Sequence, residues 1–383
     1  MKLSTHVPIL KALPSPMILC IALFVPTVAY AQHYTQSNLV SNVAVTPAAT
    51  ILDPNLKNPW GMVASATSPW WVSNNAGGTS TLYSMTLAAL PVPAIIPING
   101  TGIVTVPNAP SQSAPGIPTG IMFNGSPTDF LLAPGLPARF IFATEDGTIS
   151  GWNSGPTAVI KVDNSQSPNA LHGAIYKGAA IAEIDGKRFI LAANFRSGRI
   201  DVFDSSFNPV QHCEELFDND GIPRGYAPFN VRGIGPNIYV TYAKQDAAKH
   251  DLVMGPGLGF VEVFDHHGRR LAHLQHGPWF NGPWGIALAP ANFGEFSHAL
   301  LIGQFGDGTV AAFNPLTGRF LGNVLKPDGS TFAVPGLWEL VFGNDGAGGF
   351  GKILFFTAGI NDEQDGLLGA LTPIAAEQDG DEE

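Results

Sequence analysis

The chain has 383 residues and a formal net charge of −11, because 30 acidic residues outnumber 19 Lys and Arg residues. A face that binds nucleic acid needs a basic stripe, and the sequence contains no Lys/Arg cluster, so we expect no nucleic-acid partner. With 44 Gly, 32 Pro and 13% charged residues, the composition is typical of many short strands joined by turns, with few helices.

The first 31 residues have the pattern of an export signal. Lys2 and Lys11 precede the apolar run 17–28, and residues 29–31 form an A-x-A cleavage site. We therefore expect a mature chain that begins at Gln32 and resides in the periplasm or outside the cell. A retained N-terminal anchor is the alternative. No later stretch reaches the ~18 apolar residues that a spanning helix needs.

Cysteine is scarce in this chain. Cys20 lies within the predicted signal, so Cys213 is the one cysteine of the expected mature protein and no internal disulfide can form. Cys213 follows His212, which would suit a nucleophile, but no other residue of that loop supports such a site. The fold must therefore be held by packing and strand pairing.

A unit of roughly 55 residues recurs six times along the chain. Each unit starts with an apolar strand, expected at 58–64, 118–123, 176–181, 227–231, 282–288 and 336–342. A second apolar strand follows in each, at 70–73, 140–143, 189–192, 238–242, 300–302 and 353–356. Third strands follow polar turns at 148–152, 199–204, 260–265 and 309–314. The equivalent positions of the first strands, here termed anchors, recur at intervals of 52 to 59 residues and are Gly61, Gly120, Gly178, Asn230, Gly285 and Glu339.

Four strands in about 55 residues make one blade of a β-propeller. The sequence therefore predicts an all-β, six-bladed β-propeller over residues 32–375, followed by an acidic, disordered tail at 376–383. Glycine suits the anchors because inner strands approach closely at the axis, and we expect Trp60, Trp284 and Trp338 to wedge between blades. The sixth unit lacks a fourth strand, so residues 34–40 should supply it, close the ring and remove two open edges.

Several segments carry a resemblance to a known family across about residues 34–370. They are Phe142–Ile149, Gly225–Asn230, Val240–Asp246, Phe305–Gly308 and Phe356–Gly359. Through them the chain resembles a family of uncharacterised exported bacterial proteins related to NHL-type six-bladed propellers, which implies the fold and export. More distantly, the architecture is similar to calcium-dependent lactonases and organophosphate hydrolases. The chain departs from the repeat at Glu339, where a small residue is expected.

Two anchors that are not glycine indicate a possible metal site. Asn230 and Glu339 should point toward the channel, and calcium prefers several oxygen ligands from different segments. Glu145 and Asn194 follow second strands, and these turns lie on the same face as the turns that enter the first strands. These four residues are our candidate ligands for calcium at the channel mouth. The alternative is that they bind water or neighbouring backbone.

The polar loop 243–259 holds the candidate catalytic residues. Long polar loops on a rigid scaffold often carry binding function. His250 could act as a general base, oriented by Asp246 or Asp251, while Lys244 could polarise a carbonyl group. The alternative is a solvated surface loop without a catalytic role.

The remaining histidines suggest a weaker alternative. His172 and His276 precede the third and fifth first strands, and together with His250 they would permit a zinc site. His266 and His267 belong to an outer turn, where we expect them to face solvent.

No G-x-S-x-G, Walker A, H-E-x-x-H or paired-cysteine motif occurs. The sequence thus favours an exported, monomeric propeller that binds a small molecule, a glycan or an envelope protein at the channel mouth. The alternative is a calcium-dependent hydrolase of a small ester or lactone. Whether the protein is an enzyme stays open at this point.

Overall fold

The computed structural model describes residues 33–210, 216–218 and 220–374. The predicted signal, Cys213 and the acidic tail lie outside the described residues. Within the described part of the chain, no helix has the length and apolar content of a membrane span.

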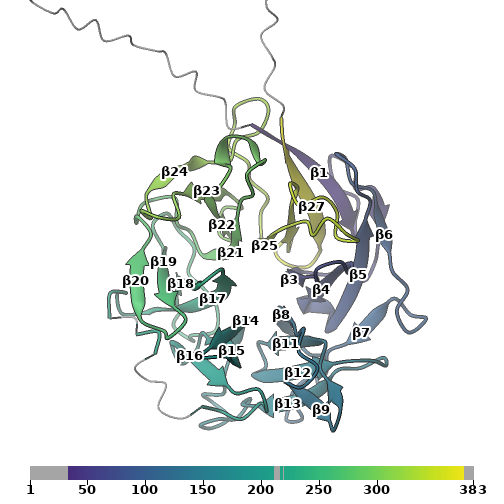
Figure 1. Ribbon diagram of the computed structural model, residues 1–383, viewed down its shortest axis with the longest axis vertical. Coiled ribbons are helices and arrows are strands. Elements are labelled where there is room, and N and C mark those ends of the chain that lie inside the picture. The colour runs from purple at the N-terminus through teal and green to yellow at the C-terminus, as the bar shows by residue number, and fades with distance from the viewer. Residues whose placement is uncertain (1–32, 211–215, 219, 375–383) are drawn as a thin grey trace, which may run out of the picture. The chain divides into compact units, whose positions relative to one another are not determined.

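Six sheets, antiparallel apart from one short parallel pair in blade 6, form a ring around a common axis (Figure 1), which confirms the predicted six-bladed β-propeller. Blade 1 contains β3 (Pro59–Val63), β4 (Trp70–Asn74), β5 (Thr79–Met85) and β6 (Pro93–Ile95), with β7 (Ile103–Thr105) also paired to β5. Blade 2 contains β8 (Pro118–Phe123), β11 (Phe140–Thr144), β12 (Thr148–Trp152) and β13 (Val159–Asp163). Strands β9 (Leu131–Ala133) and β10 (Leu136–Pro137) form a separate hairpin. Blade 3 contains β14 (Tyr176–Ile184), β15 (Lys187–Asn194) and β16 (Arg199–Phe203).

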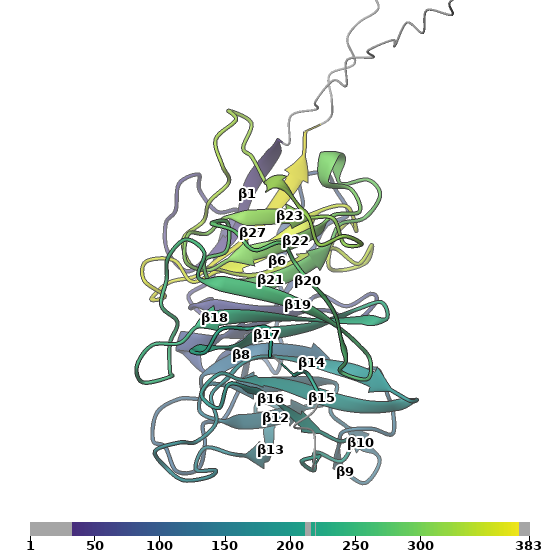
Figure 2. The ribbon, with the colours of Figure 1, turned by 90° about the vertical axis from the view of Figure 1, so that its left-hand side faces the viewer.

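The second half of the ring repeats this plan. Blade 4 contains β17 (Tyr226–Ile234), β18 (Asn237–Lys244), β19 (Gly259–Asp265) and β20 (Arg270–His273). Blade 5 contains β21 (Pro283–Leu288), β22 (Leu300–Gln304), β23 (Val310–Phe313) and β24 (Phe320–Asn323). Among the described residues, two single-turn 3₁₀ helices also occur, η1 (Asn75–Gly77) and η3 (Gly294–Phe296). Seen from the side, the sheets of blades 2, 3 and 4 stack face to face (Figure 2), so each blade buries its apolar faces against its neighbours.

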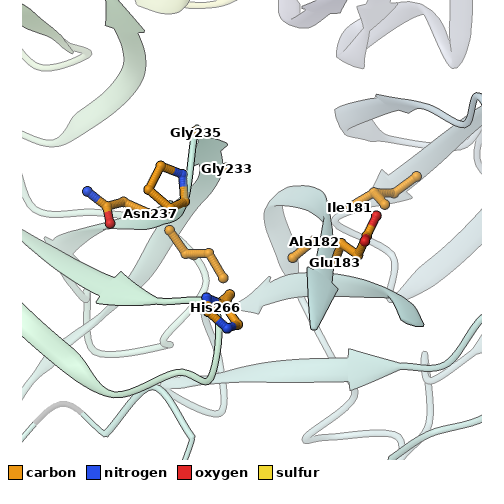
Figure 3. Close-up of a pocket in the computed structure, with 9 residues that line it drawn as sticks. Ile181, Ala182, Glu183, Gly233, Gly235, Asn237 and His266 are labelled. Carbon is orange, nitrogen blue, oxygen red and sulfur yellow. The ribbon is translucent and has the colours of Figure 1, made fainter. Parts of the chain in front are cut away.

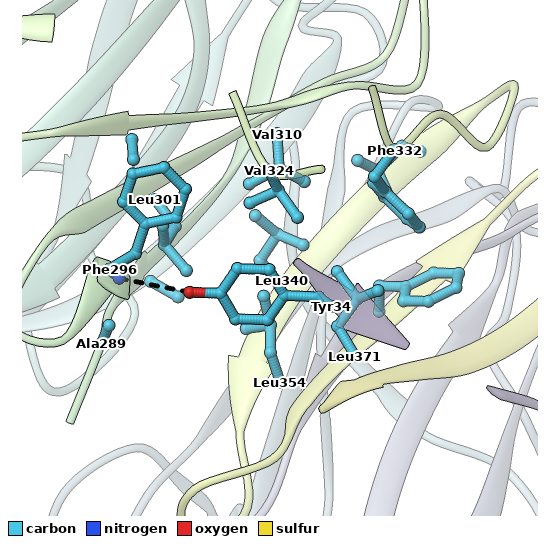
Figure 4. Close-up of a cluster of buried hydrophobic side chains, with 14 of the residues drawn as sticks. Tyr34, Ala289, Phe296, Leu301, Val310, Val324, Phe332, Leu340, Leu354 and Leu371 are labelled. Atoms are coloured by element: carbon cyan, nitrogen blue, oxygen red, sulfur yellow. Dashed lines mark hydrogen bonds between the residues drawn. The ribbon is translucent and has the colours of Figure 1, made fainter. Parts of the chain in front are cut away.

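The N-terminal strand closes the ring, as predicted. Blade 6 contains β25 (Leu337–Phe342), β26 (Leu354–Ala358), β27 (Leu367–Pro373), β1 (Tyr34–Ser41) and β2 (Ile51–Leu52) in that order. Strand β1 pairs antiparallel with β27. The Tyr34 hydroxyl donates to the Phe293 carbonyl at 2.9 Å and accepts from the Phe296 N–H at 3.2 Å (Figure 4), which ties β1 to blade 5.

The glycine anchors lie where inner strands of adjacent blades touch. A Cβ on Gly61 would lie 2.7 Å from the Thr119 carbonyl oxygen, and a Cβ on Gly120 would lie 2.6 Å from the Ala179 nitrogen. Such separations are shorter than van der Waals contact, so a side chain there would force the blades apart. This confirms the steric reason for glycine at these anchors.

The three tryptophans before the anchors were expected between blades. Trp60, Trp284 and Trp338 pack on one another near the axis, and Trp338 joins its two neighbouring blades in this way. Trp60 stacks on Trp338 with ring centroids 3.6 Å apart, and Trp284 stands edge-on to both, at 6.2 and 5.6 Å. Blades 1 and 5 are not neighbours in the ring, so the contact between Trp60 and Trp284 crosses the axis, whereas Trp338 of blade 6 contacts a tryptophan of each neighbouring blade. Because successive strand residues point to opposite sides, the residue before an anchor faces the axis when the anchor faces the next blade.

Candidate functional site

A group of ionisable side chains gathers at the end of the axis where the turns after the second strands meet, here called the mouth. The group, termed the mouth cluster, draws on blades 1, 2, 3, 4 and 6 and consists of Asn75, Glu145, Lys177, His250, Asp251 and Glu363. Three of its members, Glu145, His250 and Asp251, hold one potential ligand atom each within 4.8 Å of one another.

Lys177 is the centre of the mouth cluster. It precedes the anchor Gly178, and its side chain is 1% exposed. Its Nζ lies 5.4 Å from the ring centroid of Trp60 and 5.9 Å from that of Phe195, so the ammonium rests against the aromatic side chains around the axis. The same Nζ donates to Glu145 Oε1 and, at 2.9 Å, to Oδ1 of Asp251.

These contacts fix the charge of Lys177. Burial favours the neutral amine, but the carboxylates of Glu145 and Asp251 outweigh burial and raise the pKa of Lys177 above its ordinary value. The side chain is therefore a permanently charged ammonium at neutral pH. It can attract or orient a ligand, but it cannot act as a nucleophile.

The loop between β18 and β19 places His250 beside this charge. Its Nδ1 lies 3.1 Å from Oδ2 of Asp251, and this hydrogen bond is the main reason that the pKa of His250 is raised. The same bond, together with the Lys177 ammonium, lowers the pKa of Asp251. Asp251 is thus the residue that orients the imidazole. Asp246 instead accepts the backbone N–H of His250 at 2.9 Å and shapes the loop.

Lys244 lies apart from these groups. Its Nζ contacts the Arg224 carbonyl at 3.5 Å and lies 5.0 Å from the centroid of the Tyr226 ring. The described contacts therefore do not join Lys244 to the mouth cluster, where Lys177 supplies the positive charge.

Glu363 enters the mouth from a strained turn after β26. Asn361, Asp362 and Glu363 all have positive φ, at 54°, 54° and 64°, and left-handed backbone costs ~1–2 kcal/mol per residue. Burial, followed by repulsion from Glu145, raises the pKa of Glu363 to about 7. No hydrogen bond to its carboxylate occurs within the described residues. Strain of this kind is concentrated at functional sites.

The two anchors predicted to bind calcium form hydrogen bonds with other groups of the protein. Asn230 donates from Nδ2 to the Trp284 carbonyl at 2.9 Å, and its Oδ1 accepts the Val231 N–H at 2.8 Å. Glu339 Oε1 accepts from the Leu340 N–H and from Arg232, both at 3.1 Å. Burial nevertheless raises the pKa of Glu339. Both side chains thus stabilise the contacts around the axis.

The other two predicted ligands are also engaged. Asn194 Oδ1 accepts the N–H groups of Ile175 and Ser197, and its Nδ2 donates to Asp201 at 2.9 Å. Glu145 bonds Lys177 through Oε1 and accepts from Asn75 through Oε2, at 2.8 Å. Of the two predicted glutamate ligands, Glu145 belongs to a possible metal-holding group of the described residues and Glu339 does not. The calcium site stays a prediction, and these hydrogen bonds do not favour it.

The histidines predicted as a zinc alternative do not form a group among the described residues. His276 Nε2 lies 3.0 Å from the Gly257 carbonyl oxygen, and its ring stacks on Phe260 with centroids 4.5 Å apart. His266 and His267 instead form a second possible metal-holding group with Asp185.

Sequence reasoning missed three members of the mouth cluster: Asn75, Lys177 and Glu363. A signal for Lys177 exists, because the other five repeats place Trp60, Thr119, Phe229, Trp284 and Trp338 before the anchor, and a lysine breaks that uncharged pattern. Asn75 follows a second strand, as Glu145 does, so its position at the mouth could also have been predicted from the sequence. Glu363 lies in an irregular loop and has no such signal.

Fold and site together define a six-bladed β-propeller with a polar, ionisable mouth. The chain belongs to the family of two proteins of Acanthamoeba polyphaga mimivirus, "Uncharacterized protein R648" and "Uncharacterized protein L690". Each is 31% identical to it, over 87% of this chain and over 78% and 84% of the viral proteins, respectively. These relatives are viral, so they do not support the expected bacterial family. No family model matches the sequence.

Solved structures with a similar architecture include a streptogramin B lyase, with 10% identity and a TM-score of 0.45 over 89% of this chain and 98% of that chain. Another is a glucose dehydrogenase, with 14% identity and a TM-score of 0.44 over 89% of this chain and 100% of that chain. Similarity at this level carries no argument about function.

Proposed function

We propose that the protein binds a small polar ligand at the mouth, through the mouth cluster. The environment of the Glu363 carboxylate is the observation that carries the proposal. The Glu363 side chain is half-buried near Glu145 and Asp251, has a pKa raised to about 7, and belongs to a segment of left-handed backbone. Partial burial of an acid that lacks a hydrogen-bond donor costs free energy, and a ligand that supplies a donor can remove that cost.

The charges of the cluster indicate the class of ligand. Lys177 neutralises one carboxylate, which leaves an excess of acceptor oxygens among Glu145, Asp251 and Glu363. A ligand that brings hydrogen-bond donors, as an ammonium group or as several hydroxyls, would complement them. A glycan or an envelope protein would have to present the same donor groups.

Thermal unfolding tests the proposal. We expect glucosamine, spermidine or sorbitol, as probes of amine and hydroxyl chemistry, to raise the Tm of the wild-type chain at pH 8, where Glu363 is ionised. Glu363→Gln should lose the shift, while Glu183→Gln, an exposed glutamate at the far end of a strand, should keep it. An equal shift in wild type and Glu363→Gln, or no shift with any probe class, would contradict the proposal.

A second candidate, hydrolysis of a small ester or lactone, is favoured by the contact between His250 and Asp251. A carboxylate that orients an imidazole is the arrangement of a general base that activates water. Turnover of an ester and lactone panel should fall by about 10²-fold or more in His250→Ala and should persist in His172→Ala. Equal activity in His250→Ala would contradict it.

Calcium dependence is a separate arm of that assay. If calcium takes part, treatment with EGTA should abolish turnover and lower the Tm, and calcium should restore both. Turnover and Tm that EGTA does not change would show that hydrolysis does not depend on calcium.

We also propose that the chain is exported, on the basis of the N-terminal sequence pattern. Mass spectrometry of protein from the native source should find a first residue at Gln32 in an extracytoplasmic fraction. An intact N-terminus on protein in the cytosolic fraction would contradict export.

A further inference from the structure

Two hairpin turns from adjacent blades meet at the end of the axis opposite the mouth. Asp185 lies in the turn between β14 and β15, and His266 and His267 lie in the turn between β19 and β20. Strand direction places both turns at that end, because β14 and β19 each run away from the mouth. The site is therefore distinct from the mouth cluster.

The three side chains converge. One ligand atom from each lies within 4.8 Å of the others, and Asp185 Oδ1 is 3.9 Å from His267 Nε2. The two imidazole rings have centroids 4.1 Å apart. His266 also borders a pocket of about 290 Å³ between β14 and the β17–β18 turn, which Glu183 and Asn237 line as well (Figure 3).

Turn chemistry explains only part of this arrangement. Asp185 and Gly186 have φ values of 50° and 72°, and Asp-Gly is a favoured pair for a two-residue hairpin turn. Asp265 accepts the backbone N–H of His267 at 2.9 Å, which fixes the second turn. Neither requirement calls for two consecutive imidazoles directed at a carboxylate.

We propose that Asp185, His266 and His267 bind a divalent transition-metal ion of the zinc type. Zinc takes histidine nitrogen and aspartate oxygen at about 2.0–2.2 Å in tetrahedral geometry, which requires ligand atoms about 3.4 Å apart. The 3.9 Å between Asp185 Oδ1 and His267 Nε2 exceeds this value by about half an ångström, and the other separations stay within 4.8 Å, so rotation of the side chains has to bring the ligand atoms closer together. Water in the adjoining pocket supplies the fourth ligand.

Such an ion would link blades 3 and 4. Three protein ligands with one open position resemble exchangeable rather than closed structural sites. Because the unfolded chain does not assemble this set, ion binding should stabilise the fold.

Isothermal titration of the untagged full-length chain with Zn²⁺ at pH 7.5, together with metal analysis after dialysis, tests the proposal. The double variant His266→Ala/His267→Ala removes two ligands, and Asp185→Asn removes the third. His250→Ala removes the histidine of the other possible metal-holding group, which belongs to the mouth cluster. His172→Ala removes an exposed histidine that belongs to neither group.

We expect wild type, His250→Ala and His172→Ala to share a zinc-binding event and a Tm increase that the double variant lacks. Asp185→Asn should weaken that event by more than about tenfold. No zinc binding by wild type overturns the proposal, and so does unchanged binding by the double variant. Loss of all binding in His250→Ala would place the ion at the mouth and also overturn it. The first two of these results do not bear on ligand binding by Glu363.

Discussion

The Nζ of Lys177 bonds Glu145 from blade 2 and, at 2.9 Å, Asp251 from blade 4, while its own backbone belongs to blade 3. One ammonium therefore joins three consecutive blades at the mouth, next to the aromatic side chains at the axis. Its lost solvation is compensated by two carboxylates rather than by water.

Replacement of Lys177 by Met should strongly destabilise the protein. The substitution leaves Glu145, which is 8% exposed, without its cation, and breaking a buried ion pair costs about 3–5 kcal/mol. Urea unfolding measures the change. Lys244→Met, which removes a partly exposed ammonium outside the cluster, should stay within about 0.5 kcal/mol of wild type. Similar values for both variants would show that the Lys177 ion pairs contribute little.

Glu363 should make stability depend on pH in a definite direction. Its pKa is raised from 4.5 to about 7 in the folded protein, so the folded chain binds more protons than the unfolded chain between these values. The free energy of unfolding therefore falls as pH rises from about 4.5 to 7. Glu363→Gln should flatten this part of the profile and be the more stable protein at pH 8, by up to about 3 kcal/mol. Identical pH profiles for the two proteins would rule out the raised pKa.

Asp251→Asn should lower the pKa of His250, because it removes the charged partner of Nδ1. NMR titration of the His250 ring protons measures this shift. In wild type the raised pKa stabilises the fold fully below the unfolded value near 6.5, and this contribution is lost as pH rises through the folded pKa. Asp246→Asn, which alters only a bond to the His250 backbone, should leave the ring titration nearly unchanged. A shift in that variant instead would assign the orienting role to Asp246.

Gly120→Ala should destabilise the ring by about 1–3 kcal/mol, because the added Cβ would lie 2.6 Å from the Ala179 nitrogen of the next blade. Gly125→Ala is the matched control, since its Cβ would meet the Phe123 ring at an ordinary 3.4 Å. Thermal unfolding compares the two. Equal Tm values would mean that the inner strands are not as tightly packed as these distances indicate.

The sequence predicted the blades because their constraints repeat. Anchors such as Gly61 and Gly120 meet the same steric demand at every inner strand, so the demand appears as a period in the chain. The pairing of residues 34–40 followed from counting strands in the sixth unit. His250 and its two candidate partners could be predicted because they lie within one loop. Which aspartate orients the imidazole, Asp251 or Asp246, depends on side-chain direction, which the sequence does not give.

The rest of the site depends on contacts between different blades. Lys177 meets Asp251 only because loops of unequal length converge on the axis, and no local pattern encodes that meeting. Glu363 depends on a left-handed turn built without glycine, which sequence rules do not anticipate. Asn230 and Glu339 were correctly singled out as exceptions to the repeat, yet their polar atoms bond the polypeptide around the axis.

The pairing of β1 with β27 also places the two ends of the described propeller next to each other. The Ile374 N–H donates to the His33 carbonyl at 3.1 Å, and Tyr34 faces Pro373 across the ladder. A linker of a few residues could therefore join these ends as a tight hairpin. Cutting the chain in an exposed loop of another blade would then yield a circular permutant in which the closing blade is covalently continuous and the new ends can be chosen far from both the mouth and the Asp185 turn.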